Sequence, residues 1–366
     1  MSRMATGEAH KEDCLPGEFG VAVECCKSSF RGAADPVSVD MKAIDWSRLL
    51  RIVRFHRIEG LAWKYMAQAD GEIPEQVSRA LSHDASAIAA SNLRAAAECR
   101  DLSAAFNSAG LALLFLKGLP LGALAYETAS LKSSIDVDLL IDPAELERVS
   151  VLLLSRGYRL ANPRDPSKLH LWHRRSKESL WVREGLQVDL HTRTADNSRL
   201  IPRIDVRSPR QIVDLGSGIQ LATLADEQLF TYVAVHGASS AWFRLKWIAD
   251  VAGFLNGRGA DELEHLYRRS QELGAGRAAG QALLLADRLF GTLSSVRAIR
   301  DELRSDTSTR RLYEAALRLL ISGAGEPTER LFGTLPIHWT QFLLLPGSAY
   351  KLSELARQAR RAMLRG

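Results

Sequence analysis

The sequence predicts an α+β fold in which a small α/β unit lies between two helical regions. Three observations support this: apolar residues recur at helical spacing from Trp46, short strand-like apolar runs follow between Leu111 and His191, and helical spacing returns beyond about Asp214. The length of 366 residues suggests roughly two domains. The longest apolar run has six residues, whereas a membrane-spanning helix needs about 20, so no such helix is expected.

Composition and charge describe an ordinary globular chain. Apolar residues make up 46% and charged residues 25% of the sequence. The net charge is +5, and the segment Lys351–Gly366 contributes most of it, with five basic residues against one acid. Because the rest of the chain is nearly neutral, nucleic acid is not an expected partner.

The cysteines and the N-terminal segment favour a cytoplasmic protein. The four cysteines, Cys14, Cys25, Cys26 and Cys99, have no zinc-site spacing and are too few for a disulfide framework in a chain of this length. Met1–Glu24 lacks the apolar segment of a secretory signal. We therefore expect a reducing compartment.

The N-terminal part divides into a leader and a helical segment. Polar residues and glycines interrupt every apolar cluster in residues 1–40, so we expect a poorly ordered leader there. Residues 41–104 form the predicted N-terminal helical segment. An alanine-rich stretch, Val77–Gly110, favours a long helix because alanine is the best helix former.

Residues 105–215 form the predicted α/β core. Leu111–Leu116 is a buried-strand candidate, a short helix is expected over Pro120–Tyr126, and Ile135–Ile141 is a second strand. Asp142 is a suitable N-cap for a helix that ends at Gly157.

Two further strands of the core are predicted to form a hairpin. Leu180–Arg183 and Leu186–His191 are strand-like, and Glu184-Gly185 between them suggests a two-residue turn.

Residues 216–366 are predicted to form a helical C-terminal domain. Thr223 to Asp226 is a helix-start signal, and an amphipathic basic helix from about Ser348 closes the chain. The helices between them are expected near 225–237, 241–256, 260–273, 276–290 and 308–322.

The pair Asp136 and Asp138 carries the clearest chemical signal. On a strand, residues two positions apart point to the same face, and apolar residues flank this pair. Two carboxylates that close repel unless a cation lies between them, and oxygen ligands suit Mg²⁺. The alternative is an ordinary Asp-x-Asp in a loop or at a helix start.

Lys117-Gly118, just after the first predicted strand, could contact a phosphate. Glycine allows close backbone approach, a helix N-terminus offers free N–H groups, and a lysine is a point charge for phosphate oxygens. The alternative is a plain strand-to-helix turn.

Asp189 supplies a third carboxylate on a probable strand between Val188 and Leu190. Three strand-borne carboxylates suit two-metal phosphoryl chemistry, in which ions about 3.5–4 Å apart bind a triphosphate and activate a hydroxyl. His191 could hydrogen-bond the site or simply pack on its strand. Because three clustered anions repel one another, we also expect Asp138→Asn to leave the metal-free fold at least as stable.

At this point the sequence resembles the uncharacterised nucleotidyltransferase group within the DNA polymerase β-like superfamily, over roughly residues 40–260. The resemblance implies a polymerase-β-like nucleotidyltransferase core. The segments that carry it are His56–Leu61, Leu116–Gly118, Asp136–Leu140, Gly157-Tyr158, Val188–His191, His236-Gly237 and Trp242–Asp250.

The resemblance implies roles for individual residues. Asp136 and Asp138 would hold both metals, and Asp189 would complete the site on the acceptor side. Lys117 and Gly118 stand where the superfamily more often has Gly-Ser, Lys132 where the family often has arginine, and Ile135 where glycine is common. The residues expected to bind the nucleotide are Lys117, Gly118, Lys132 and Ser134, and those expected on the acceptor side are His191, His236, Arg244 and Asp250.

The implied function is a metal-dependent nucleotidyltransferase that moves an NMP from an NTP, ATP included, to an acceptor hydroxyl or phosphate and releases pyrophosphate. Mg²⁺ is the expected ion, with Mn²⁺ as a substitute. The acceptor is expected to be a small molecule, a sugar or a modified peptide. The alternative is a non-catalytic scaffold with this fold that binds a protein partner, because one fold hosts many functions.

Overall fold

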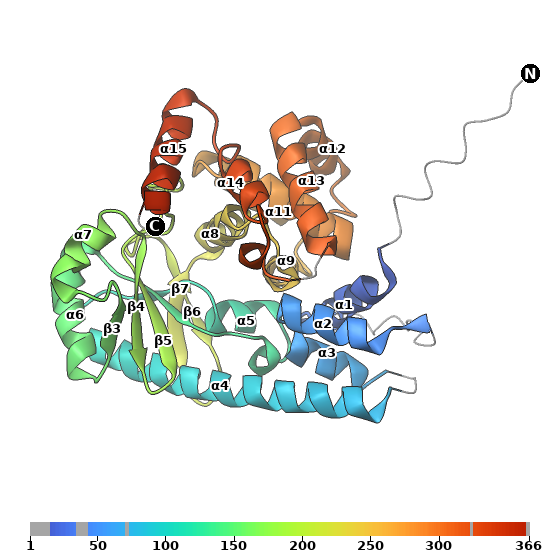
Figure 1. The fold of residues 1–366 in the computed structure, drawn as a ribbon, viewed down its shortest axis with the longest axis horizontal. Helices are drawn as coiled ribbons and strands as arrows, with labels where there is room; N and C mark the ends of the chain where they lie inside the picture. The colour runs from blue at the N-terminus through green and yellow to red at the C-terminus, as the bar shows by residue number, and fades with distance from the viewer. Residues whose placement is uncertain (1–14, 34–42, 70–72, 323–324, 364–366) are drawn as a thin grey trace, which may run out of the picture.

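The structure is a computed structural model that describes residues 15–33, 43–69, 73–322 and 325–363. Four helices come first, and the fourth runs under both the other N-terminal helices and the sheet (Figure 1). This long helix, α4, confirms the helix expected from the alanine-rich stretch. The four are α1 (Gly17–Lys27), α2 (Trp46–His56), α3 (Glu59–Met66) and α4 (Glu75–Ser108).

Helix α1 contradicts the expected poorly ordered leader over residues 15–33. Its apolar side chains, among them Phe19 and Val21, are buried and belong to the larger of two hydrophobic clusters. The buried Glu18 carboxylate accepts a hydrogen bond from the Asp45 backbone N–H at 3.2 Å. Short apolar clusters suffice here because α1 packs against α2, α3 and a later helix. Residues 1–14 and 34–40 of the expected leader lie outside the described part.

A five-stranded mixed sheet forms the centre of the α/β region, with strand order β1-β2-β5-β4-β3. Strands β2 and β5 are parallel, and the other neighbouring pairs are antiparallel. The predicted α+β fold is therefore confirmed. The strands are β1 (Leu114–Phe115), β2 (Val137–Leu140), β3 (Arg159–Asn162), β4 (Glu178–Arg183) and β5 (Leu186–His191), and the connecting helices are α5 (Leu119–Ala125), α6 (Leu146–Ser155) and α7 (Leu169–His173).

The predicted hairpin is confirmed, and its turn fixes the register of β4 against β5. Glu184 and Gly185 both have left-handed φ angles, 46° and 80°, as a two-residue type I′ turn requires. Leu180 consequently pairs with Asp189, and Glu178 pairs with His191. The first two predicted strands are shorter than expected, because only Leu114–Phe115 and Val137–Leu140 form ladders.

A second, two-stranded sheet was missed by the sequence analysis. Strands β6 (Arg210–Asp214) and β7 (Gln220–Leu224) pair as a hairpin. The hydroxyl of Thr223 on β7 donates a hydrogen bond of 2.6 Å to the Phe115 carbonyl on β1. The core boundary expected at residue 215 therefore falls inside the turn of this hairpin, and β7 packs against the central sheet.

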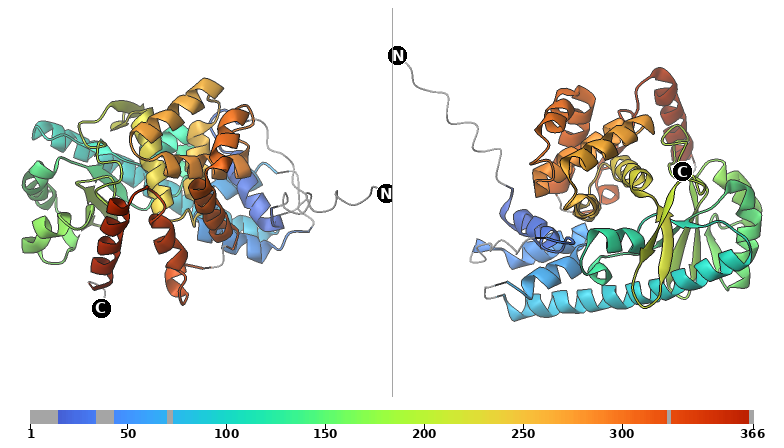
Figure 2. Two further views of the ribbon diagram at one scale, coloured as in Figure 1. Left: turned by 90° about the horizontal axis from the view of Figure 1, so that it is seen from above. Right: turned by 180° about the vertical axis from the view of Figure 1, so that it is seen from behind.

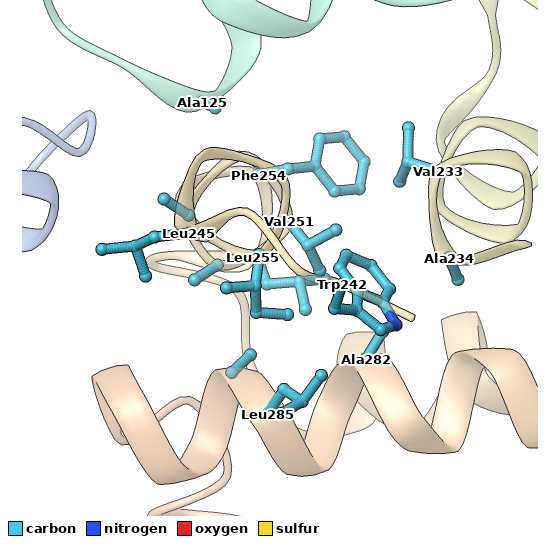
Figure 3. Packing of buried hydrophobic residues seen from close by; sticks show 14 of the residues in the cluster. Ala125, Val233, Ala234, Trp242, Leu245, Val251, Phe254, Leu255, Ala282 and Leu285 are labelled. Carbon is cyan, nitrogen blue, oxygen red and sulfur yellow. The ribbon is translucent and has the colours of Figure 1, made fainter. Parts of the chain in front are cut away.

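Most of the remaining helices pack around α8, α9 and α11, which carry many fully buried residues. An added Cβ at Gly237 on α8 would lie 2.3 Å from the Trp242 ring, so glycine is required for this contact. Figure 3 shows Trp242 between Val233 and Ala234 on one side and Ala282 and Leu285 on the other. The helices are α8 (Asp226–Ser239), α9 (Leu245–Leu255), α10 (Ala260–Glu272), α11 (Gly276–Phe290), α12 (Arg297–Ser305), α13 (Thr307–Ile321), α14 (Leu335–Gln341) and α15 (Ser348–Met363).

The basic terminal helix α15 lies on the sheet side of the C-terminal region, apart from α11, α12 and α13 (Figures 1 and 2). Its Glu354 carboxylate is buried, is ion-paired with Arg357 and accepts a hydrogen bond of 2.9 Å from the Asn197 amide in the segment after β5. Helix α15 is thus anchored next to the end of β5. Across the described residues, no helix combines the length and apolar character needed to cross a bilayer.

Candidate functional site

The parallel strands β2 and β5 bring two of the predicted aspartates face to face. Asp138 on β2 and Asp189 on β5 are register partners, although they are far apart in the sequence. His191 follows two positions later on β5, so it projects to the same side. One ligand atom from each of Asp138, Asp189 and His191 lies within 4.8 Å of the others.

Asp136 joins this group through Lys117. The Lys117 ammonium forms an ion pair with Asp138 and lies 3.7 Å from the Asp136 carboxylate. Lys117 follows β1, which pairs antiparallel with β2, so the sheet itself brings the lysine to the two acids. Burial alone would lower the pKa of Lys117, but the two carboxylates outweigh burial and raise that pKa well above its usual range.

Asp138 is almost fully buried and remains charged. Burial alone would raise its pKa, but Lys117 and the imidazole of His191 outweigh burial and hold that pKa far below its usual range. The Asp138 carboxylate lies 3.0 Å from His191 Nε2. Its charge is therefore balanced inside the protein.

Strand β4 adds a fourth carboxylate that the sequence analysis missed. The Glu178 carboxylate lies 3.3 Å from His191 Nε2 and 2.9 Å from the Lys177 ammonium. Burial would raise the pKa of Glu178, but Lys177 lowers it below its usual range. The signal that could have found Glu178 is the two-residue turn, which places it opposite His191.

Asp189 is in the opposite situation to Asp138. Burial, followed by the charges of Glu178, Asp138 and Asp136, raises the pKa of Asp189 to about 8. Its carboxyl therefore holds a proton at neutral pH in this arrangement. Crowded carboxyl oxygens that cannot all ionise together are the donor set that a hard divalent cation stabilises, so these residues fit a metal such as Mg²⁺.

Gly118 and Ser134 lie beside this cluster. Gly118 has a left-handed φ of 71°, and an added Cβ would lie 3.0 Å from the Ser134 hydroxyl oxygen. The Ser134 hydroxyl in turn donates to the Asp136 carbonyl at 3.4 Å. The structure thus brings Gly118, Ser134 and Asp136 together. Gly118 is also the N-cap residue of the seven-residue helix α5.

Lys132, expected to bind the nucleotide, and Asp250, expected on the acceptor side, contact each other in the structure. The Lys132 ammonium is 3.3 Å from the Asp250 carboxylate, and both side chains are buried. Asp250 also accepts a hydrogen bond of 2.9 Å from the Tyr126 hydroxyl. Two buried opposite charges stabilise each other, so this pair holds the segment before β2 against α9. The roles expected for Lys132 at the nucleotide and for Asp250 at the acceptor stay predictions.

Arg244, expected on the acceptor side, makes several contacts within the fold. It donates to the Phe55 carbonyl and to the Glu326 carboxylate, and it is 4% exposed. Its guanidinium also stacks on the Phe55 and Phe243 rings at 5.2 Å. These contacts hold Arg244 against α2 and Glu326, and its expected role on the acceptor side stays a prediction.

Helix α8 presents Tyr232 and His236 towards the carboxylate cluster. Burial and the charges of Lys117 and Lys177 lower the pKa of His236 well below its usual range, so the imidazole is neutral. Its ring lies 6.1 Å from Tyr232 and 5.9 Å from Trp247, measured between centroids. The fully buried Tyr232 hydroxyl has no hydrogen-bond partner among the described residues. Tyr232, Lys177 and Glu178 are the residues of this region that the sequence analysis missed.

Comparison with known proteins identifies the family. Residues 42–291 match a family described as uncharacterised nucleotidyltransferase. Searches of curated proteins and of solved structures each found no match. The matched segment contains β1 to β7 and the whole carboxylate cluster, and it covers more than half of the 366 residues. The chain therefore belongs to this nucleotidyltransferase family, as its sequence motifs predict.

Proposed function

We propose that this protein transfers a nucleoside monophosphate from an NTP to an acceptor hydroxyl or phosphate and releases pyrophosphate. The observation that carries the proposal is the pairing of Asp138 with Asp189 on neighbouring parallel strands, with Asp136 at the start of β2. This arrangement supplies converging oxygen ligands from two strands. The family match supports the transferase class.

Mg²⁺ is the proposed ion, held by Asp136, Asp138 and Asp189. When bound, it would neutralise charge on the triphosphate and lower the pKa of an attacking hydroxyl. Lys117 is the chain's own cation next to these acids and is proposed to contact phosphate oxygens. Catalysis would then consist mainly of positioning and electrostatic stabilisation.

Asp189 is proposed to act on the acceptor side. The acceptor oxygen attacks the α-phosphorus, the bond to pyrophosphate breaks, and the hydroxyl proton moves to a nearby base. Without metal the Asp189 carboxyl holds a proton, because burial and the neighbouring acids raise its pKa to about 8. A divalent ion bound there would displace that proton and leave a carboxylate that could accept the hydroxyl proton.

The acceptor is proposed to be a small molecule, a sugar or a modified peptide. The near-neutral body of the chain does not favour a long nucleic acid. The neutral His236 and Trp247, whose ring centroids lie 5.9 Å apart, are both partly exposed and offer a small aromatic surface, while Tyr232 beside His236 is fully buried. Such a surface suits a ring of small size.

A non-catalytic scaffold is the second candidate. The observation in its favour is that Lys117 already balances Asp138 and Asp136 within the protein. In that case the carboxylates would be structural, and the helices would bind a partner protein.

The test is incubation of the full chain with each labelled NTP, Mg²⁺ or Mn²⁺, and a fractionated cell extract. We expect label transfer and pyrophosphate release with at least one NTP, and loss of both in Asp138→Asn and Asp189→Asn. Asp101→Asn, a partly exposed acid on α4, is the matched control and should remain active. Absence of pyrophosphate with every NTP and every fraction would support the scaffold.

A further inference from the structure

Lys117 lies in a position that a bridging metal ion would also need. Its ammonium contacts Asp138 and lies 3.7 Å from Asp136, the two carboxylates that share one face at β2. We propose that Lys117 is a built-in cation of this site, which competes with the divalent ion for Asp136 and Asp138 and moves to the triphosphate when the ion binds. This inference rests on the proposed function, because it concerns the same site.

The competition follows from the geometry. A divalent ion held by both Asp136 and Asp138 would need direct contact with oxygens of the two carboxylates. The Lys117 ammonium donates into the same space between the same oxygens. A single and a double positive charge a few ångströms apart in a partly buried site repel each other strongly. The lysine and the ion therefore cannot both hold this bridge.

The other cation of the cluster does not compete in this way. Lys177 pairs with Glu178 at 2.9 Å, and no contact links it to Asp136 or Asp138 among the described residues. It carries the same charge as Lys117 and lies in the same cluster. Lys177 is therefore a matched control that separates occupancy of the bridge from a general effect of positive charge.

A displaced Lys117 side chain would stay close to the site. It stands at the end of β1 next to Gly118, which lies against the Ser134 side chain beside Asp136. Its charge is felt at the Tyr232 hydroxyl, which is buried and has no hydrogen-bond partner among the described residues. A displaced ammonium therefore remains near the edge where the phosphates would bind.

A consequence is that the metal and the nucleotide assist each other. Without nucleotide, the ion must displace Lys117 from a charge-assisted contact and leave the ammonium without an anion. With nucleotide, the phosphate oxygens receive the ammonium. We expect metal affinity to rise when an NTP binds, and by linkage NTP affinity to rise by the same factor when metal binds.

The test measures Mn²⁺ binding to the full chain without nucleotide, by the electron paramagnetic resonance signal of free Mn²⁺. Lys117→Met should bind Mn²⁺ about 10- to 100-fold more tightly than wild type, since one charge-assisted contact no longer competes. Lys117→Arg should keep the weak binding. Lys117→Gln is the second neutral variant, and thermal melting without metal verifies that each variant folds.

The Lys177→Met control separates occupancy of the space between Asp136 and Asp138 from a general effect of positive charge. Lys177→Met should change Mn²⁺ affinity much less than Lys117→Met does. Equal gains in the two variants would overturn the proposal, as would Mn²⁺ binding to Lys117→Met and Lys117→Gln that is no tighter than in wild type. Absence of Mn²⁺ binding in every variant would overturn it together with the metal-dependent function. Tighter Mn²⁺ binding in Lys117→Met, together with no nucleotidyl transfer by the wild type with any NTP, would refute the proposed function alone.

Discussion

Strands β2 and β5 carry one aspartate each at facing positions, yet their surroundings push the two carboxyls in opposite directions. Asp138 on β2 contacts Lys117 and His191, and its pKa lies far below the usual range. Asp189 on β5 is crowded by Glu178 and the other two aspartates, and its pKa rises to about 8. The same residue type on the same kind of strand thus has two charge states at neutral pH.

This difference shows that the three aspartates are not equivalent. The sequence analysis treated them as mutually repelling anions, so neutralising any one of them was expected to leave the fold at least as stable. The structure leads us to expect this for Asp189 but not for Asp138, because Asp138 is ion-paired with Lys117 and Asp189 has no such pair among the described residues. Four substitutions would sharpen or break this comparison.

The largest expected effect comes from Asp138→Asn. Removing one partner of a buried ion pair leaves Lys117 with only the more distant Asp136, and such changes cost about 3–5 kcal/mol of unfolding free energy. Urea unfolding without metal measures this loss. A variant as stable as wild type would mean that the Lys117 contact contributes little and that the sequence-based expectation was right.

Asp189→Asn should instead increase the free energy of unfolding. The pKa of Asp189 is raised in the folded state, so the unfolded chain releases this proton at about pH 4 and the folded chain only near pH 8. Stability of the wild type is consequently lost as pH rises through that window, and the asparagine variant avoids the loss. Melting temperatures from pH 4 to 9 should show a gain for Asp189→Asn that grows up to about pH 8. A gain independent of pH would contradict the raised pKa.

Glu178→Gln should produce a smaller change, visible as a shift of that pH window. After burial, Glu178 is the main cause that raises the pKa of Asp189. In the Glu178→Gln background the gain from Asp189→Asn should therefore be smaller and should level off at lower pH. Comparing the double variant with Glu178→Gln alone cancels the effect of leaving Lys177 without its partner. If the pH range of the gain does not change, Glu178 is not a main cause of the raised pKa of Asp189.

The smallest effect is expected from Lys246→Met, on α9 next to the segment that precedes β2. The Lys246 ammonium donates to the Ser133 carbonyl at 3.4 Å, and burial together with the charge of Lys132 lowers its pKa to about 7. The unfolded chain binds this proton up to about pH 10, so wild-type stability should rise between about pH 7 and 10. The methionine variant should lack that rise. Melting curves across this range, with wild type in parallel, test the prediction.

Local pattern was enough to predict much of the candidate site. The acids at Asp136, Asp138 and Asp189 were found from strand-like apolar flanks, and the turn at Glu184-Gly185 predicted the hairpin. Counting residues outward from that two-residue turn would also have placed Glu178 opposite His191. Leader residues were misjudged because the short apolar clusters of α1 are stabilised by distant helices.

By itself, the sequence determined most of the helices and the strands of the central sheet, because hydrophobic period and turn residues are local properties. It did not reveal α1 or the β6–β7 hairpin. Only the tertiary structure decided which buried charges meet: Lys117 with Asp138, and Lys132 with Asp250. A buried charge must find a partner wherever the packed elements bring one, and that partner can lie more than a hundred residues away. The charge state of each aspartate depends on such tertiary contacts and therefore cannot be predicted from its local sequence.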